Sequence, residues 1–296
     1  MALSSTNTIS NLQEKVIGPA RMTLKDDVLA IKSSFNVVTG SPGMDDTYNS
    51  PKLPGVTAFG LSEGVDMVSE TLIDSSVPIS ATEVGVSVEF TNKMLRTIRR
   101  DQMLRDAGAA MGSAVNVKQE QDFATLIDGF SQTVGADGAA GTIGQLAAAI
   151  AQLRNANEPL NEAMFRDVSA VVHPYLWNDI SQLLFPTGEG ASNARTPTPD
   201  NIATQQMGNW FPRGSYFGTP VKISSNLVTS GTNARSGVFH RNSGLIYEFM
   251  PVELDVDDSD KSLRSIELVM VIDYGFGEIL DDHGREWDHD ITTPTS

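Results

Sequence analysis

The sequence predicts a mixed α+β protein, and two patterns far apart in the chain predict it. In residues 83–90, apolar side chains alternate with polar residues or glycine, the period of two that is typical of a half-buried strand. From residue 95 to residue 130, apolar residues recur at steps of three and four, as on one face of a helix. Later, residues 252–256 alternate and residues 263–272 return after a turn, which predicts an antiparallel hairpin.

The helix after the first strand is the longest element that the sequence predicts. Thr91 is a favourable N-cap residue, and no proline lies between it and residue 133. About 40 helical residues would span roughly 60 Å, more than the roughly 50 Å width of a compact domain of this length. Gly108 and Gly112 each cost about 1 kcal/mol relative to alanine and would permit a kink or break between residues 108 and 117. With or without that break, the pattern predicts an extended, flattened subunit.

Composition excludes several classes of function. The chain contains no cysteine, which excludes disulfides, thiolate zinc sites and cysteine nucleophiles. Its net charge of −16 makes it a poor free-standing nucleic-acid binder, because such proteins carry a basic surface. No apolar run approaches the roughly 20 residues that span a bilayer, and no signal peptide is visible. We therefore expect a soluble cytoplasmic protein that does not bind membranes.

The first 81 residues are predicted to hold an arm and a projecting hairpin. Residues 1–35 contain two short amphipathic patterns on either side of Gly18-Pro19, which indicates an arm that packs on another surface. Residues 56–81 show no helical period and are acidic, yet their apolar content is too high for simple disorder. Because a long excursion inside a compact domain is usually functional, we predict a hairpin that buries its apolar side chains against a neighbouring subunit.

The middle of the chain predicts an α/β segment. Residues 135–144 form a glycine-rich loop, and Thr142 and Gln145 then make a capping box that opens a helix. In chain order, the further predicted elements are a buried strand at 168–172, a helix that starts at His173-Pro174 and ends at 184, a polar loop at 185–213, and short strands at 219–223 and 237–240. The acidic tail from Asp281 onward is expected to fray.

Few residues suggest catalytic chemistry. The side chains in the tail that could in principle hold a divalent ion are Asp281, Asp282, His283, Asp288, His289 and Asp290. Their spacing matches neither a helical histidine pair nor a calcium-binding loop, so a solvated tail is favoured and a metal-dependent enzyme is a remote alternative. His173 and His240, each at the end of a strand, are most simply structural. The glycine-rich loop lacks the Lys-Ser/Thr of a phosphate-binding loop, and no serine-nucleophile motif is present. We predict no catalytic, cofactor-binding or metal-binding residue.

One contrast of charge is more informative than these motifs. The excursion at 56–81 is almost purely acidic, whereas basic residues crowd the start of the long helix: Lys93, Arg96, Arg99, Arg100 and Arg105. Cations at a helix N-terminus oppose the helix dipole, so another group should stabilise them. Two interpretations stay open, a solvated charged face or a surface that binds a partner, which would be a neighbour's acidic loop or a polyanion.

The order of these elements resembles that of the major capsid proteins of tailed double-stranded DNA bacteriophages, which share the HK97-like fold. The segments that carry the resemblance to the strand and start of the family's extended loop (E-loop) are Asp46-Thr-Tyr-Asn-Ser-Pro-Lys52 and Leu61-Ser-Glu-Gly64. Thr91-Asn-Lys-Met-Leu95 is similar to the start of the family's spine helix. The segments similar to the axial domain are Val171-Val-His-Pro174, residues 175–183 and Phe217-Gly-Thr-Pro-Val221, and those similar to the return into the peripheral domain are Gly237-Val-Phe-His240 and residues 252–274.

The resemblance implies an HK97-like capsid fold divided along the whole chain. The implied parts are an N-terminal arm at 1–43, a peripheral-domain strand at 44–53, the E-loop at 54–82, the peripheral domain with the spine helix at 83–134, the axial domain at 135–245, and a return to the peripheral domain with a C-terminal tail at 246–296. The implied function is that of a shell protein, not an enzyme, which assembles into hexamers and pentamers of an icosahedral head.

The resemblance also implies partners and a location. The chain would bind other copies of itself, with separate scaffold, portal and cement proteins as further partners, and would enclose double-stranded DNA without reading its sequence. It would reside in the virion capsid after assembly in the host cytoplasm. An encapsulin-like cellular compartment, or a tail or decoration protein of a virion, stays an alternative.

Two departures from the family limit what the resemblance implies. Some members join subunits by an isopeptide bond between an E-loop lysine and an asparagine of the peripheral hairpin. Here residues 56–92 contain no lysine and residues 253–268 contain no asparagine, so this cross-link is not expected. There is also no long N-terminal extension of the kind that serves as a fused scaffold, which implies a separate scaffold or none.

The charge contrast gives the resemblance a specific hypothesis. Three acidic residues of the E-loop in one subunit would meet three arginines at the start of the spine helix in the next: Glu63, Asp66 and Glu70 with Arg96, Arg99 and Arg100. In a rival placement, the same arginines face the packaged DNA.

Overall fold

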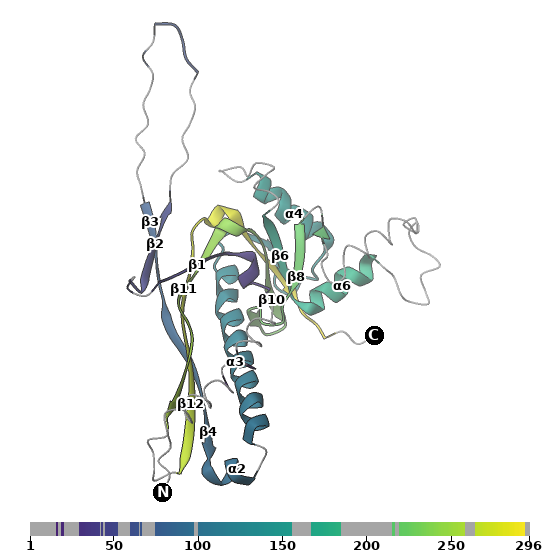
Figure 1. Cartoon of the computed structure of the whole chain (residues 1–296). Helices are drawn as coiled ribbons and strands as arrows, with labels where there is room; N and C mark the ends of the chain where they lie inside the picture. Colours follow the sequence, from purple (N-terminus) through teal and green to yellow (C-terminus); the bar gives the residue numbers. More distant parts are fainter. Residues whose placement is uncertain are drawn as a thin grey trace, which may run out of the picture.

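The computed structural model describes residues 16, 19–20, 30–41, 43, 45–52, 60–64, 66, 75–97, 100–155, 167–184, 215–216, 219–257 and 264–293. Over these residues the chain forms a long helix beside a long sheet, a second sheet at one end of that helix, and a two-stranded ribbon that projects from the body (Figure 1). This is the extended α+β subunit that the sequence predicts. None of the described helices is long and apolar enough to cross a membrane.

The long sheet contains the strand predicted at 83–90 and the predicted hairpin. Over the described residues its strand order is β1 (Asn36–Thr39), β11 (Gly244–Asp257), β12 (Ser265–Glu278) and β4 (Thr82–Thr91). β11 and β12 form the predicted antiparallel hairpin, and β12 pairs with β4 antiparallel. Both hairpin strands are longer than predicted, because buried apolar residues extend β11 back to Gly244 and β12 forward to Glu278. β1 adds to β11 in parallel.

The helical pattern divides into α2 (Asn92–Thr97) and α3 (Arg100–Asp128). The hydroxyl of Thr91 accepts a hydrogen bond from the Met94 backbone N–H at 3.3 Å, as expected of an N-cap. The break permitted between residues 108 and 117 does not occur, because α3 runs through this range. Gly108 serves a different purpose: a Cβ there would lie 2.4 Å from the backbone oxygen of Val16, so glycine lets the N-terminal segment approach the helix closely.

The second sheet contains seven strands among the described residues. They are β5 (Thr133–Gly135), β6 (Val168–Val172), β7 (Ser215–Tyr216), β8 (Thr219–Ile223), β9 (Thr229–Ser230), β10 (Asn233–His240) and β13 (Gly284–Asp290). The order is β5-β13-β10-β6-β8-β7, and β9 pairs with β10. The strands predicted at 168–172 and 219–223 are confirmed, the one at 237–240 begins earlier, and β5 was not predicted.

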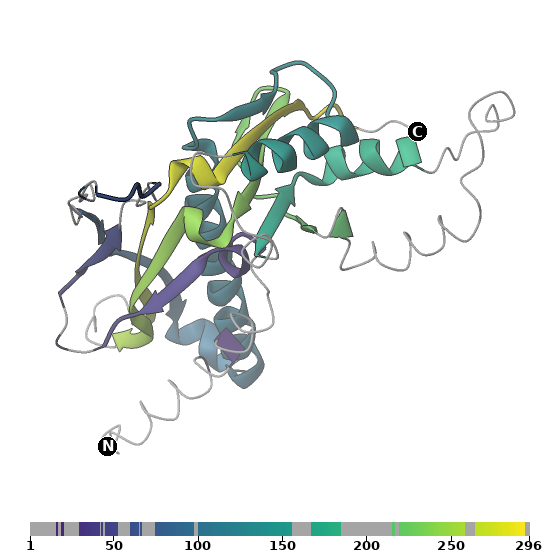
Figure 2. The same cartoon turned by 90° about the horizontal axis from the view of Figure 1, so that it is seen from above.

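Two helices cover one face of this sheet and α3 covers the other. α4 (Ile143–Arg154) begins with the predicted capping box, and α6 (Pro174–Leu184) follows β6 as predicted. Both helices pack on Val168, Ala170 and Val172, whereas Val171 packs with the residues of α3. Figure 2 shows the two helices, in teal, on the same side of the sheet. Both faces of β6 are covered, so all five of its residues are buried, and Ser169 is the one polar residue among them.

The C-terminal segment corrects one prediction. Instead of fraying, residues after Asp281 form a short 3-10 helix, η4 (Asp281–His283), and then β13, which lies between β5 and β10. Trp287 and His289 of this strand are fully buried. The acidic composition was misleading, because two of these carboxylates, on Glu286 and Asp288, are buried beside Arg235 of β10.

A two-stranded ribbon flanks the segment predicted as a hairpin at 56–81, most of which lies outside the described residues. β2 (Thr47–Lys52) pairs antiparallel with β3 (Ser75–Ser80). The ribbon is fixed to the body by Ile79, which is buried against Leu245 and Tyr247, and by the stacked rings of Tyr48 and Tyr247, whose centroids lie 5.5 Å apart. Most of the predicted arm at 1–35 and the polar loop at 185–213 lie outside the described residues.

Candidate functional site

The six residues of the charge hypothesis lie in two separate regions. Glu63 and Asp66 are exposed in the connection between β2 and β3, whereas Glu70 and Arg99 lie outside the described residues. Arg96 and Arg100 are described only by their backbone, in α2 and at the start of α3. The β2–β3 ribbon and α2 lie at opposite ends of the subunit (Figure 1). A contact between the two regions therefore needs a second subunit, and the pairing stays a prediction.

The segment before β1 is held to the body by polar contacts that sequence analysis did not identify. The Ile31 backbone N–H donates to one carboxylate oxygen of Glu120 at 3.0 Å, and the Ser224 hydroxyl donates to the other at 2.8 Å. Lys222 donates to the hydroxyls of Ser33 and Ser34, both at 2.8 Å. Because Glu120 is buried in the C-terminal half of α3, its carboxylate ties this segment to both the helix and the second sheet.

Burial changes the pKa of Lys222 in this contact. Lys222 is partly buried, and this burial lowers the pKa of its ammonium group, an effect that nearby Glu120 opposes and Arg241 reinforces. The lysine has two hydroxyl acceptors in place of water. In the described structure, these two hydrogen bonds position the segment 31–35.

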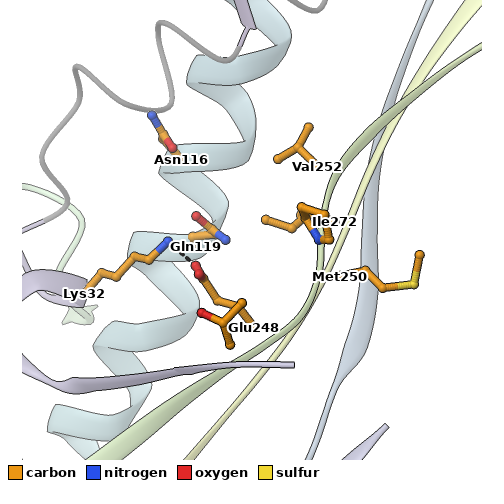
Figure 3. A pocket seen from close by; sticks show the side chains of 9 residues that line it. Lys32, Asn116, Gln119, Glu248, Met250, Val252 and Ile272 are labelled. Carbon is orange, nitrogen blue, oxygen red and sulfur yellow. Dashed lines mark ion pairs between the residues drawn. The ribbon is translucent and has the colours of Figure 1, made fainter. Parts of the chain in front are cut away.

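A pocket of about 170 Å³ lies next to this contact, between α3 and the hairpin β11–β12. Figure 3 shows the Gln119 amide between the Lys32–Glu248 ion pair and the apolar side chains of Val252 and Ile272. Gln119 is only 1% exposed, and its Nε2 atom has no hydrogen-bond partner among the described residues. The pocket therefore combines apolar walls with an unused hydrogen-bond donor.

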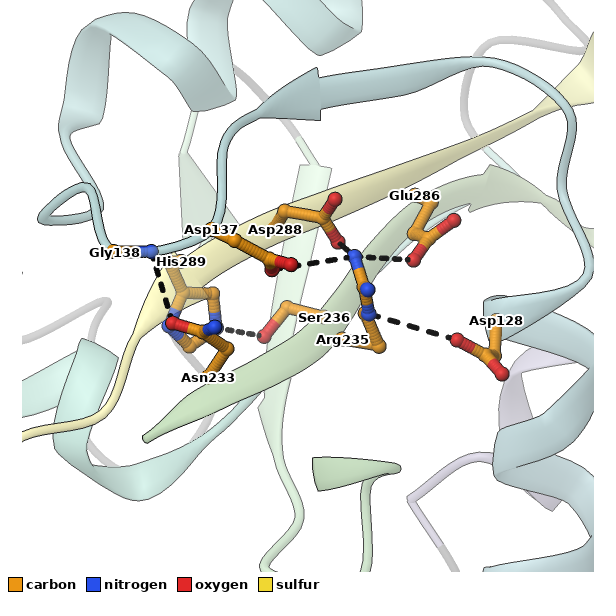
Figure 4. A network of polar contacts seen from close by, with 9 residues as sticks. All are labelled: Asp128, Asp137, Gly138, Asn233, Arg235, Ser236, Glu286, Asp288 and His289. Atoms are coloured by element: carbon orange, nitrogen blue, oxygen red, sulfur yellow. Dashed lines mark hydrogen bonds and ion pairs between the residues drawn. The ribbon is translucent and has the colours of Figure 1, made fainter. Parts of the chain in front are cut away.

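A cluster of charges joins the end of α3 to the second sheet (Figure 4). The guanidinium of Arg235, on β10, faces four carboxylates: it lies 3.6 Å from Asp128, 3.6 Å from Asp137 and 3.2 Å from Glu286, and it forms a close ion pair with Asp288. Asp128 ends α3, Asp137 belongs to the glycine-rich loop, and the other two lie on β13. One cation thus fixes three elements to β10.

The excess of carboxylates in this cluster shifts their ionisation. Burial, followed by a hydrogen bond with Asp288 and the negative charge of Asp288, raises the pKa of Glu286 to about 8. The hydrogen bond to Asp288 raises the pKa of Arg235, so the guanidinium stays charged. At neutral pH the cluster therefore retains a proton on Glu286, which reduces repulsion among its carboxylates.

A second pair of carboxyl groups lies where β12 leaves the long sheet. Burial, together with a hydrogen bond to Asp281, raises the pKa of Glu278 to about 7. Burial alone would raise the pKa of Asp281, but hydrogen bonds from Ser131 outweigh burial and lower it. The two carboxyl groups thus share a proton near neutral pH, at the junction between the two sheets.

The histidines contribute to the core of the second sheet. His289 Nε2 and the Ser236 hydroxyl lie 2.7 Å apart, and that hydroxyl accepts from the His173 backbone N–H at 3.2 Å. Burial lowers the pKa of both His173 and His289, so these rings are held neutral. The described part of the chain contains no group of three or more histidine, cysteine, aspartate or glutamate side chains able to hold a metal ion.

Sequence reasoning missed Arg235 and Glu120 because none of their partners is close in the chain. It missed Gln119 because the pocket that this residue lines is formed by elements distant in the chain. Trp287 was a signal that could have identified β13, since a tryptophan in a solvated tail is unusual. The acidic residues around Trp287 concealed this signal.

Comparisons with known proteins identify the architecture. Residues 74–284 match the family model described as phage capsid protein, whereas no curated protein matches the chain. Among solved structures, the chain resembles the Cyanophage Pam1 capsid, with a TM-score of 0.63 at 10% identity over 88% of this chain and 90% of that chain. It also resembles the head of Helicobacter pylori bacteriophage KHP40, with a TM-score of 0.61 at 11% identity over 87% of each chain.

A chain of Mycobacterium phage Che8 gives a TM-score of 0.59 at 14% identity over 82% of this chain and 85% of that chain. At these identities the likeness of structures establishes the fold, which is the HK97-like fold that the sequence suggests. The family model covers most of the chain and describes a structural protein of the virion. The chain therefore belongs to the phage capsid protein family and is a major capsid protein.

Proposed function

We propose that copies of this chain assemble into the hexamers and pentamers of an icosahedral head that encloses double-stranded DNA. The observation that carries the proposal is the shape of the subunit: a long body whose β2–β3 ribbon projects from one end while α2 lies at the other (Figure 1). A contact between unlike ends of identical subunits is heterologous, and heterologous contacts that close produce rings.

The chain's charge supports the same proposal. The acidic residues Glu63 and Asp66 belong to the projecting part, and Arg96 and Arg100 belong to the opposite end. Pairing of these groups between neighbours would set the register of subunits around a capsomer. Because individual exposed pairs contribute only about 0–1 kcal/mol, several of them repeated over a closed shell are needed.

The proposal extends to the division of the chain and to its partners. The arm, E-loop, peripheral and axial parts would follow the boundaries given above. Assembly would take place in the host cytoplasm, with separate scaffold, portal and cement proteins. An overall charge of −16 suits a shell that encloses DNA without gripping it along its length.

Charge reversal tests the contact between unlike ends. The variant Arg96→Glu/Arg99→Glu should fail to form closed particles when expressed under conditions in which the wild type assembles. Adding Glu63→Lys/Asp66→Lys should restore part of the assembly, because the interacting charges are then exchanged. Particles that form normally but retain little DNA would instead place the arginines on the inner surface. If the Arg96→Glu/Arg99→Glu variant assembles and retains DNA as the wild type does, the hypothesis of charge pairing is wrong.

A further inference from the structure

Two short connections run directly between the two sheets in the described structure, and they lie against each other. The first leaves β10 through a 3-10 helix, η3 (Arg241–Ser243), and enters β11, whereas the second leaves β12 through η4 and enters β13. The carbonyl oxygen of Ser243 accepts hydrogen bonds from the backbone N–H groups of Ile279 and Leu280, at 2.8 and 3.1 Å. The position of one sheet relative to the other is therefore set where these two turns meet.

Side chains add to this backbone contact. The imidazoles of His240, at the end of β10, and His283, in η4, are both buried and pack edge to face with ring centroids 5.8 Å apart. Asn242 of η3 accepts a hydrogen bond from the side chain of Asn36, on β1, at 2.6 Å. Short turns at the ends of rigid elements are places where hinges form, because a few residues there can absorb a change of backbone angle.

One carboxylate fixes the second turn. Asp281 accepts from the backbone N–H of Ser131 at 2.9 Å and, through its other oxygen, from the hydroxyl of Ser131. Ser131 lies between the end of α3 and the start of β5, so Asp281 joins η4 to the end of the long helix. Because both oxygens of Asp281 accept, this carboxylate is ionised, and the hydrogen bond that it shares with Glu278 needs a proton on Glu278.

Two cations from other elements face this pair of carboxyl groups. The charge of Lys52, on β2, favours the ionised form of Glu278, and the charge of Arg285, on β13, favours the ionised form of Asp281. Arg285 is itself held to η4, because it donates to the carbonyl oxygen of Asp282 at 3.0 Å. Loss of the proton from Glu278 would remove the donor between the two carboxyl groups and leave two negative charges in contact.

We propose that the junction of η3 and η4 is a hinge between the two sheets, and that the proton shared by Glu278 and Asp281 closes it. With that proton in place, Glu278 donates to Asp281 and η4 stays attached to the end of β12. Without the proton the two carboxylates repel, η4 loosens, and the hydrogen bonds from Ile279 and Leu280 to Ser243 open. This inference concerns the single subunit, so it does not depend on assembly into a shell.

The direction of the pH dependence follows from the ordinary pKa of glutamate. Glu278 has a pKa of about 7 in the closed junction, against about 4.3 for a glutamate in water. The closed state is therefore fully favoured at low pH and loses this preference as pH rises to about 7. Between about pH 5 and pH 7, the opening equilibrium should increase by at most about tenfold per pH unit, and above this range it should level off. Asp281, whose pKa is lowered, titrates below this range.

Hydrogen exchange of the Ile279 and Leu280 amides in dissociated subunits tests the hinge, with rates corrected for the intrinsic effect of pH. The protection of these amides should fall by about 10- to 100-fold between pH 5 and pH 7. The variant Glu278→Gln should keep high protection throughout, because its amide group still donates to Asp281 at every pH. Glu278→Ala, which has no donor, should lose protection already at pH 5. Glu253→Gln, which alters an exposed residue of β11, is the matched control and should behave as the wild type does.

Three results would overturn the inference. If Glu278→Gln keeps the pH dependence of the wild type, the titrating group lies elsewhere, for example in the pair of imidazoles. If Ile279 and Leu280 exchange in step with the amides of β6 at every pH, the junction opens only when the whole subunit unfolds. Protection that stays constant with pH in the wild type would show that the shared proton does not hold the turn.

Discussion

Glu286 provides a test of how charge holds the second sheet together. The residue is only 7% exposed, and burial among carboxylates raises its pKa to about 8, against about 4.3 in an unfolded chain. Between these two values the folded protein holds a proton that the unfolded chain has released. The free energy of unfolding contributed by this group therefore falls as pH rises, by at most about 1.4 kcal/mol per pH unit.

The variant Glu286→Gln removes this titration while retaining the size of the side chain. The groups that face Glu286 are Arg235 and Asp288, with Asp128 and Asp137 on the other elements of the cluster. Between about pH 5 and pH 8, the stability of the variant relative to the wild type should rise steadily, by about 1 kcal/mol per pH unit. Above this range, the difference should become constant.

Urea unfolding of dissociated subunits, followed by circular dichroism at several pH values, measures this difference. Glu253→Gln is the matched control, because Glu253 is an exposed residue of β11, outside the cluster. Its stability profile should run parallel to that of the wild type. If the profile of Glu286→Gln is also parallel to the wild type, the account of the cluster is wrong.

Three further predictions concern how the subunit is held together, each measured by the same unfolding assay. Arg235→Met should cost about 2–4 kcal/mol near pH 8, because it leaves two buried carboxylates without their cation; equal stability would show that the cluster does not depend on Arg235. Gly108→Ala should cost about 1–3 kcal/mol because its Cβ would meet the Val16 backbone, whereas Gly144→Ala, whose Cβ has no atom nearer than 3.7 Å, should stabilise α4 by up to about 1 kcal/mol. If Gly144→Ala destabilised the protein more than Gly108→Ala, this would contradict the close approach of the Val16 backbone to α3. Thr142→Ala should cost about 1 kcal/mol by removing the capping box, and no loss would mean that the box contributes little.

The elements that the sequence predicts well are those with local signals. The alternation in β4, the cap at Thr91 and the capping box at Thr142 each depend on neighbours within a few residues, and all three are present in the structure. Periodicity also identified the β11–β12 hairpin, because its inner face is apolar in both strands.

The elements that were missed depend on partners distant in the chain. β13 looked like a solvated tail because Glu286 and Asp288 pair with Arg235, which no local pattern links to them. Gly108 suggested a break because glycine has a low helix propensity. That propensity takes no account of the Val16 backbone, which packs against the helix at this position. The pocket beside Gln119 was likewise invisible, since it arises where β1 stops and β11 continues.

Assembly is the central claim, and electron microscopy of the purified protein tests it most directly. The chain should be expressed together with the other head proteins of its phage, purified, and examined by negative stain beside light scattering. The account predicts closed particles, or rings of five and six subunits as their precursors. A protein that remains monomeric under these conditions would contradict the proposal that this chain builds the shell.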